Sequence, residues 1–259
     1  MTVPESNKRK DLNSTYRMSV QVSLTGLSFL LEEEDAVFFS KTINFRETKN
    51  PDEILLDIEA AFEQNPTLNQ PVFDLVIIHQ NPLYTLVPNS LFKEEEAASY
   101  LKINSRIFTT DFVAFDSLEN HELVNVYVPF ANVNNYFFER YGEFSFYHFT
   151  TTFLENILKK EKTGNPVKMY AHLHGHQVDV IVTSGKKILL SNSFSYTTPE
   201  DLTYYILFVA EQLELNPEVF HLELSGQIDE QDSNFELLYT YIRFVTIENN
   251  ATPHLRIEN

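Results

Sequence analysis

The amino-acid sequence predicts an α/β protein built from two copies of one βββαβ unit. An alternation of apolar and polar residues typical of three strands occurs twice, and each time an amphipathic helix follows that opens on proline and two acidic residues. Leu24 precedes Pro51 by 27 residues and His172 precedes Pro199 by the same 27, which predicts a repeat of 172 − 24 = 148 residues. A repeat of this length indicates duplication of a whole domain rather than a solenoid.

The first copy begins with a predicted antiparallel meander. Residues 20–24 alternate between apolar and polar, as expected for a strand with one buried face. Thr25-Gly26 marks a turn, and two further strands are expected at 27–31 and 36–45.

A helix and a buried strand complete the first copy. The helix is predicted over 50–66, because Asn50 is a typical N-cap, Pro51 suits the first turn, and acidic residues follow where the helix dipole favours them. Residues 73–79 form a continuous apolar run, which is typical of a strand covered on both faces. A right-handed crossover through the helix would make this strand parallel to the first strand.

The second copy repeats this order, and the first copy carries extra elements. In the second copy we expect strands from 167 to the turn at Gly175 and at 178–183, 187–195 and 219–224, a helix after Thr197 or Thr198, and a closing helix at 234–245. The extra elements of the first copy are helices at 93–102 and 132–141 and a strand at 123–130. The chain is therefore expected to comprise a flexible polar tail at 1–15, a first half at 16–163 and a second, shorter half at 164–259.

Several short phrases resemble DUF3822, an uncharacterised bacterial family common in Bacteroidetes. They are Tyr84 to Pro88 with Leu91-Phe92, Tyr127 to Pro129, Leu224 to Ile228, and Leu238-Tyr239 with Tyr241 to Arg243. The resemblance covers the chain after the tail. It implies the actin-like ATPase (ASKHA) fold of actin and the sugar kinases, in which two ribonuclease H-like βββαβ halves enclose a central cleft.

The same resemblance implies a nucleotide site at the turn between the first two strands of each half. An Asp and glycines at such turns let backbone N–H groups surround phosphate oxygens and place Mg²⁺. Here the turns at 22–28 and 172–177 each contain one glycine and no Asp, and a Gly-Gly pair that receives adenosine in such proteins is represented only by Ser225-Gly226. The residues expected at a degenerate nucleotide site are Thr25, Gly26, Gly175, Ser225 and Gly226. ATP hydrolysis and a bound cofactor are therefore not expected, whereas binding of Mg·ATP without hydrolysis stays open.

Three histidines stand at alternate positions around Gly175. His172 and His174 would share one face of a strand and so could share a metal with His176, and Asp179 is the nearest carboxylate. The alternative is that these imidazoles fill a cleft that once held phosphate and bond to one another and to nearby carbonyls. The sequence favours this alternative, because no His-Glu-x-x-His motif accompanies the histidines.

Composition limits the partners that we expect. With 19 Lys and Arg and 37 Asp and Glu the formal charge is −18, which opposes binding to nucleic acid and to anionic membranes. No apolar run is long enough for a signal peptide or a membrane span, and no cysteine is present. We therefore expect a cytoplasmic protein whose partners are proteins.

Three functions follow, in order of preference. The first is a non-catalytic pseudo-ATPase that acts through protein contacts with a partner that the sequence does not name. The second is a divergent ATP-binding protein or ATPase, and the third is a metal-dependent enzyme that uses the three histidines. The aromatic segment at 134–149 would either supply an interface or pack the seam between the halves.

Overall fold

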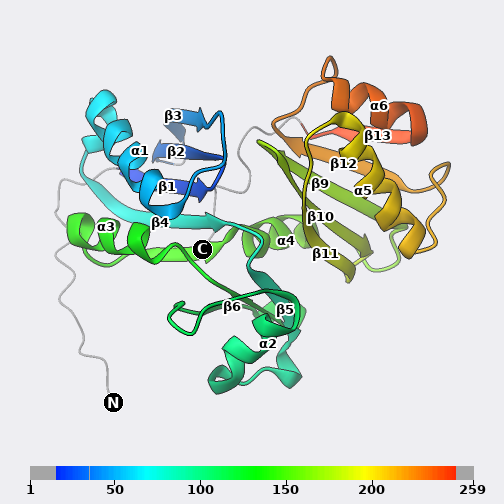
Figure 1. Cartoon of the computed structure of the whole chain (residues 1–259), viewed down its shortest axis with the longest axis horizontal. Helices are drawn as coiled ribbons and strands as arrows, with labels where there is room; N and C mark the ends of the chain where they lie inside the picture. The colour runs from blue at the N-terminus through cyan, green and yellow to red at the C-terminus, as the bar shows by residue number, and fades with distance from the viewer. Residues whose placement is uncertain (1–15, 35, 249–259) are drawn as a thin grey trace.

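A computed structural model describes residues 16–34 and 36–248 of the chain. Within these residues the chain forms two five-stranded sheets and one three-stranded sheet (Figure 1). The predicted tail at 1–15 and the last residues of the predicted second half, 249–259, lie outside the described residues. No helix in the described part of the chain is long and apolar enough to cross a membrane.

The first sheet has the strand order β3-β2-β1-β4-β8. Its first three strands form the predicted antiparallel meander, and the last two are parallel to β1. Helices α1 and α3 pack on one face of this sheet, and Asn50 caps α1 in a capping box with Glu53. The elements are β1 (Tyr16–Ser23), β2 (Gly26–Glu33), β3 (Ala36–Asn44), α1 (Pro51–Gln64), η1 (Pro66–Asn69), β4 (Val72–Gln80), α3 (Ala131–Tyr141) and β8 (Ser145–His148).

The second sheet repeats this arrangement as β11-β10-β9-β12-β13. Its elements are β9 (Val167–His174), β10 (Gln177–Ser184), β11 (Lys187–Ser195), α5 (Pro199–Gln212), β12 (His221–Gly226), α6 (Ser233–Tyr241) and β13 (Phe244–Ile247). The predicted closing helix at 234–245 was too long. Its last residues begin the Phe-Val-Thr-Ile run of β13, whose side chains favour a strand, and this strand pairs in parallel with β12.

The repeat length differs between the strands and the helices. The three meander strands start 151 residues apart (167 − 16, 177 − 26 and 187 − 36), whereas α1 and α5 start 199 − 51 = 148 residues apart. The cause is the connection from the third strand to the helix, which spans 45–50 in the first half and only 196–198 in the second. The predicted period is therefore right for the helices and wrong by three residues for the turns.

A smaller sheet is inserted between β4 and α3. It has the order β5-β7-β6 and projects from the two large sheets together with α2 (Figure 1). The predicted strand at 123–130 belongs to this sheet, as β7, and not to the first large sheet. The elements are β5 (Tyr84–Pro88), η2 (Asn89–Leu91), η3 (Glu94–Glu96), α2 (Ala97–Asn104), β6 (Ala114–Leu118), η4 (Glu119–His121) and β7 (Leu123–Tyr127).

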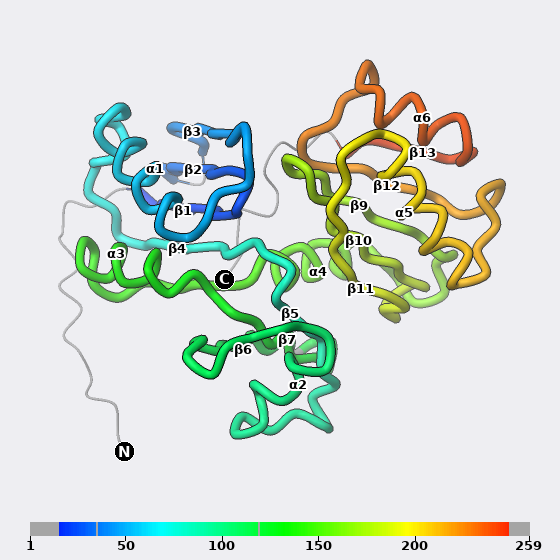
Figure 2. Tube along the Cα trace, in the orientation of Figure 1, coloured from blue at the N-terminus to red at the C-terminus, as the bar shows by residue number. Residues whose placement is uncertain are grey.

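Helix α4 (Phe149–Lys160), which the sequence analysis did not predict, lies between the two large sheets (Figure 2). Its apolar face packs in a single core with Ile78 of the first sheet and Ile181 of the second. Of the aromatic segment at 134–149, Phe149 lies in this seam core and Phe137 in the core of the first half, while Phe138 is exposed. Both halves therefore pack on α4.

The core that α4 shares with both large sheets predicts the effect of shortening one of its buried side chains. Leu154→Ala removes a fully buried side chain that contributes to this core, and we expect it to lower the free energy of unfolding by about 2 to 5 kcal/mol. Because both halves share α4, urea unfolding should stay a single transition. The control Leu56→Ala, at an exposed position of α1, should change stability by less than about 0.5 kcal/mol. Two separate transitions in the wild type would contradict a shared core.

Candidate functional site

Two turns from different halves meet at the position where the resemblance implied nucleotide phosphates. Thr25 lies in the turn between β1 and β2, and Gly175 lies in the turn between β9 and β10. The Oγ1 of Thr25 is 3.2 Å from Nδ1 of His174. A Cβ atom at Gly175 would stand 2.6 Å from the Cβ of Thr25, and Gly175 has φ +55°. Glycine is therefore required at 175 both for its backbone conformation and for the close approach of the other turn.

A second bridge joins the turn at Gly175 to the end of β3 in the first half. Gln227, just after β12, donates from Nε2 to the Asn44 side chain at the end of β3 over 2.7 Å. Its Oε1 accepts the backbone N–H of Gly175 over 2.9 Å. The backbone donor that a phosphate would need in this turn is thus bonded to a side chain of the protein.

A buried polar network continues from His174. Its Nε2 is 3.0 Å from Oδ2 of Asp179, and Gln80 donates to the same oxygen over 2.7 Å. Ser193 donates to the other carboxylate oxygen, and Gln21 donates to Gln80. The network therefore runs from the first half, through Asp179 and His174 in the second half, and back to Thr25 in the first.

The charge of Asp179 is stabilised by these partners. Burial alone would raise the pKa of this carboxyl, but the electrostatic interaction with His174 and the hydrogen bonds from His174, Ser193 and Gln80 outweigh it and hold the pKa well below its usual value. The order hydroxyl, imidazole, carboxylate is that of a hydrolytic triad. However, Thr25, His174 and Asp179 are each no more than 6% exposed, so this conformation gives a substrate no access to the hydroxyl.

The polar face of β1 is the reason this network was not foreseen. Alternation along 20–24 predicted one buried face and one exposed face. Instead Ser19, Gln21 and Ser23 are as buried as their apolar neighbours. Gln21 and Ser23 of this face bond to Gln80 and Thr25. Gln80 and Thr25 in turn bond to Asp179 and His174 of the other half, so the contact between the halves covers this end of the polar face.

The remaining expected nucleotide-site residues also make contacts within the protein. Gly26 begins β2, where a Cβ would stand 2.6 Å from the carbonyl oxygen of Ile43 in β3. Ser225 Oγ is 3.1 Å from Nδ1 of His172. A Cβ at Gly226 would clash with the Leu173 carbonyl oxygen. The five residues therefore gather around the ends of β1, β9 and β12, each closely packed.

The structure does not bring the three histidines together. His172 and His174 share a face of β9 with ring centroids 6.0 Å apart, but His172 packs against Phe149. His176 is exposed in the turn and lies against Tyr196. In the described part of the chain no group of three or more His, Asp or Glu side chains is arranged to hold a metal ion.

Two further histidines lie at the ends of the parallel strands β4 and β8. Burial lowers the pKa of His79 to about 3, and its Nε2 is 2.9 Å from the Asn134 side-chain oxygen. His148 caps α4 by accepting the Thr150 N–H, and burial lowers its pKa to about 4. The backbone N–H of His148 donates to Asp116 of β6, whose pKa burial raises to about 6. These contacts attach the small sheet to α4.

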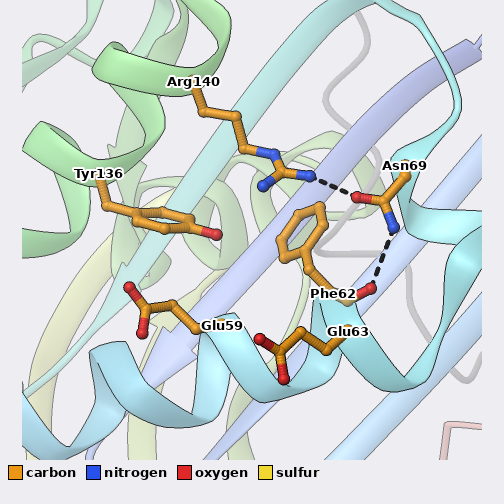
Figure 3. Close-up of a pocket in the computed structure, with 6 residues that line it drawn as sticks. All are labelled: Glu59, Phe62, Glu63, Asn69, Tyr136 and Arg140. Carbon is orange, nitrogen blue, oxygen red and sulfur yellow. Dashed lines mark hydrogen bonds between the residues drawn. The ribbon is translucent and has the colours of Figure 1, made fainter.

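A shallow hollow of about 560 Å³ lies between α1 and α3 (Figure 3). Arg140 stands over the Phe62 ring, 4.5 Å from its centroid, and donates to the Asn69 side chain. The other lining residues are Glu59, Glu63 and Tyr136. The cation of this hollow is thus already stacked and hydrogen-bonded, and the contacts join the two helices.

A family model matches most of the chain. The model of DUF3822, described as a protein of unknown function, matches residues 5–245. The chain belongs to this family. No curated protein matches this DUF3822 chain significantly.

Solved structures establish the fold of this DUF3822 protein. A Bacteroides thetaiotaomicron protein with an actin-like ATPase fold and unknown function is 24% identical, covers 94% of this chain over 95% of its own, and superposes with a TM-score of 0.79. The PilM-PilN type IV pilus biogenesis complex contains a chain that is 13% identical, with coverage of 90% and 88% and a TM-score of 0.55. The predicted actin-like ATPase fold is confirmed.

The contact between the turns predicts coupling between Thr25 and Gly175. Gly175→Ala introduces a left-handed alanine and a Cβ within 2.6 Å of Thr25, and should destabilise the protein by about 2 to 4 kcal/mol. In a Thr25→Gly background, only the backbone strain of about 1 to 2 kcal/mol should remain. Urea unfolding of the four proteins of this double-mutant cycle measures the coupling. Additive effects would contradict contact between the turns.

The buried histidines predict acid sensitivity. Their folded pKa values of about 3 and 4 lie below the ordinary 6.5, so the unfolded chain binds more protons and stability falls as pH drops below about 6.5. Asp116, with its raised pKa of about 6, acts in the opposite direction between pH 4 and 6. Together these three groups let the unfolded chain bind about one proton more than the folded chain near pH 5. The free energy of unfolding should therefore fall by about 1.4 kcal/mol for each unit by which the pH drops there.

Urea unfolding at several pH values tests this dependence. In His79→Gln one of the two histidine contributions is absent, so the slope near pH 5 should fall to about zero. An unchanged slope in this variant would show that His79 is not the group that resists protonation.

Proposed function

We propose that this DUF3822 protein is a non-catalytic, actin-like protein that acts through protein contacts, and that its own side chains fill the position of the nucleotide phosphates. The observation that carries the proposal is the contact between the turns, in which Thr25 bonds to His174 and His174 bonds to Asp179. The chain of bonds crosses from one half to the other at the point where the phosphates of a bound nucleotide would lie.

The polar groups at and beside the turns already have hydrogen-bond partners within the protein. A triphosphate with Mg²⁺ needs a carboxylate near the metal and free N–H donors around the phosphates. Asp179 accepts bonds from three side chains, and the Gly175 N–H is bonded to Gln227. Entry of a nucleotide would break these bonds, and each buried polar group left without a partner costs about 1 to 3 kcal/mol.

Two observations support a protein-contact role. A chain of similar fold is part of the PilM-PilN type IV pilus biogenesis complex, so a protein of this fold occurs in a protein assembly. The charge of −18 opposes nucleic acid and anionic membranes as partners. The cysteine-free composition suits the reducing cytoplasm in which we place the protein.

Thermal unfolding with millimolar Mg·ATP, Mg·ADP or Mg²⁺ alone tests the proposal. A ligand at 100 times its dissociation constant stabilises by about 2.7 kcal/mol, which is about 5 to 10 °C for a protein of this size. We expect no shift that depends on the nucleotide and no release of phosphate from ATP. A shift shared by ATP and ADP, and absent with Mg²⁺ alone, would overturn the proposal.

A further inference from the structure

Helix α5 presents two aromatic rings between two carboxylates on its outer face. Glu200, Tyr204, Phe208 and Glu211 are spaced at i, i+4, i+8 and i+11, so they lie along one side of the helix. We call these four residues the α5 face. Tyr204 is 61% exposed and Phe208 39% exposed, and their rings stack with centroids 6.0 Å apart.

The duplicate helix shows that packing does not require these rings. With the helix offset of 148 residues, Tyr204 corresponds to Leu56 and Phe208 to Ala60. The inner faces match, since Leu202 and Ile206 are buried like their counterparts Ile54 and Ile58. Leu56 is exposed to a similar extent, 65%, and none of the α1 residues that correspond to the α5 face is aromatic. The fold therefore tolerates small or aliphatic side chains where α5 has aromatic ones.

The part of the chain that contains the α5 face is acidic. Residues 188–242 contain ten Asp and Glu and no Lys or Arg. Helix α6, which contacts α5 on the same face of the second sheet (Figure 1), adds Glu236 and Tyr239, the latter 60% exposed. Exposed aromatic rings and carboxylates attract cations, the rings through their faces and the carboxylates through ion pairs.

We infer that the α5 face binds a segment of a partner protein that carries Lys or Arg together with apolar side chains. The rings supply stacking surface for the stems and charges of these side chains, and Glu200 and Glu211 pair with them. The net charge of −18 attracts a basic segment at long range and repels anionic membranes, nucleic acid and a second copy of this chain. This inference rests on the proposed function and names the chemistry of its partner.

The test uses the full chain and a random 12-residue peptide library displayed on phage. We expect the enriched peptides to contain several Lys or Arg and at least one apolar residue. Synthetic copies with a fluorescent label should bind the wild type in an anisotropy titration, and more weakly at higher salt. Tyr204→Ser/Phe208→Ser and Glu200→Lys/Glu211→Lys should each weaken binding about tenfold or more.

The matched control is Leu56→Ser, which removes the exposed residue at the equivalent position of α1 and should leave the affinity unchanged. The inference is overturned if no peptide is enriched, if the enriched peptides are acidic or neutral, or if binding survives in both double variants. It is also overturned if Tyr204→Ser/Phe208→Ser converts a wild-type dimer to a monomer in sedimentation, or abolishes binding to anionic vesicles.

These outcomes are distinct from failure of the proposed function. Peptides that still bind both double variants would reject the α5 face while leaving a protein-contact role intact. A nucleotide-dependent rise in melting temperature would reject the pseudo-ATPase proposal, whatever the peptides show.

Discussion

The carboxylate of Asp179 is buried between the two halves, and much of the arrangement around the turns at Thr25 and Gly175 depends on how its charge is satisfied. An isolated buried charge would be very costly, so it needs hydrogen-bond donors around it. His174 and Ser193 come from the second half, but Gln80 comes from the first, and His174 is itself bonded to Thr25 of the first half. Separating the halves would remove donors from this charge, which favours the closed arrangement.

The apolar seam and the small sheet reinforce this closure. Helix α4 packs in one core with both large sheets, so a hinge motion would expose buried apolar surface as well as Asp179. Hydrogen bonds join the small sheet to the start of α4 and to β11. Asp116 accepts hydrogen bonds from Thr151 and His148, and Tyr84 bonds to Ser191 of β11. An actin-like fold that hydrolyses nucleotide must admit phosphates between its turns, whereas here the two turns are in contact through Thr25, His174 and Gly175.

Local sequence patterns were sufficient for the repeated unit. The alternating strands predicted both meanders, and the N-cap residues with the proline and acidic residues after them predicted both crossover helices. They failed where tertiary packing decides. Helix α4 contains three consecutive threonines, which are poor helix formers. Its helicity depends on burial against both sheets. Likewise the bond between Gln80 and Asp179 joins strands 99 residues apart, and no local pattern predicts such a contact.

A crystal structure grown with magnesium and a non-hydrolysable ATP analogue tests the central claim most directly. The account predicts that Oγ1 of Thr25 and Nδ1 of His174 remain within hydrogen-bonding distance, as they are here at 3.2 Å, with no nucleotide between the turns. Triphosphate density between the turns, with Thr25 and His174 moved apart and the Gly175 N–H bonded to a phosphate oxygen, would contradict it.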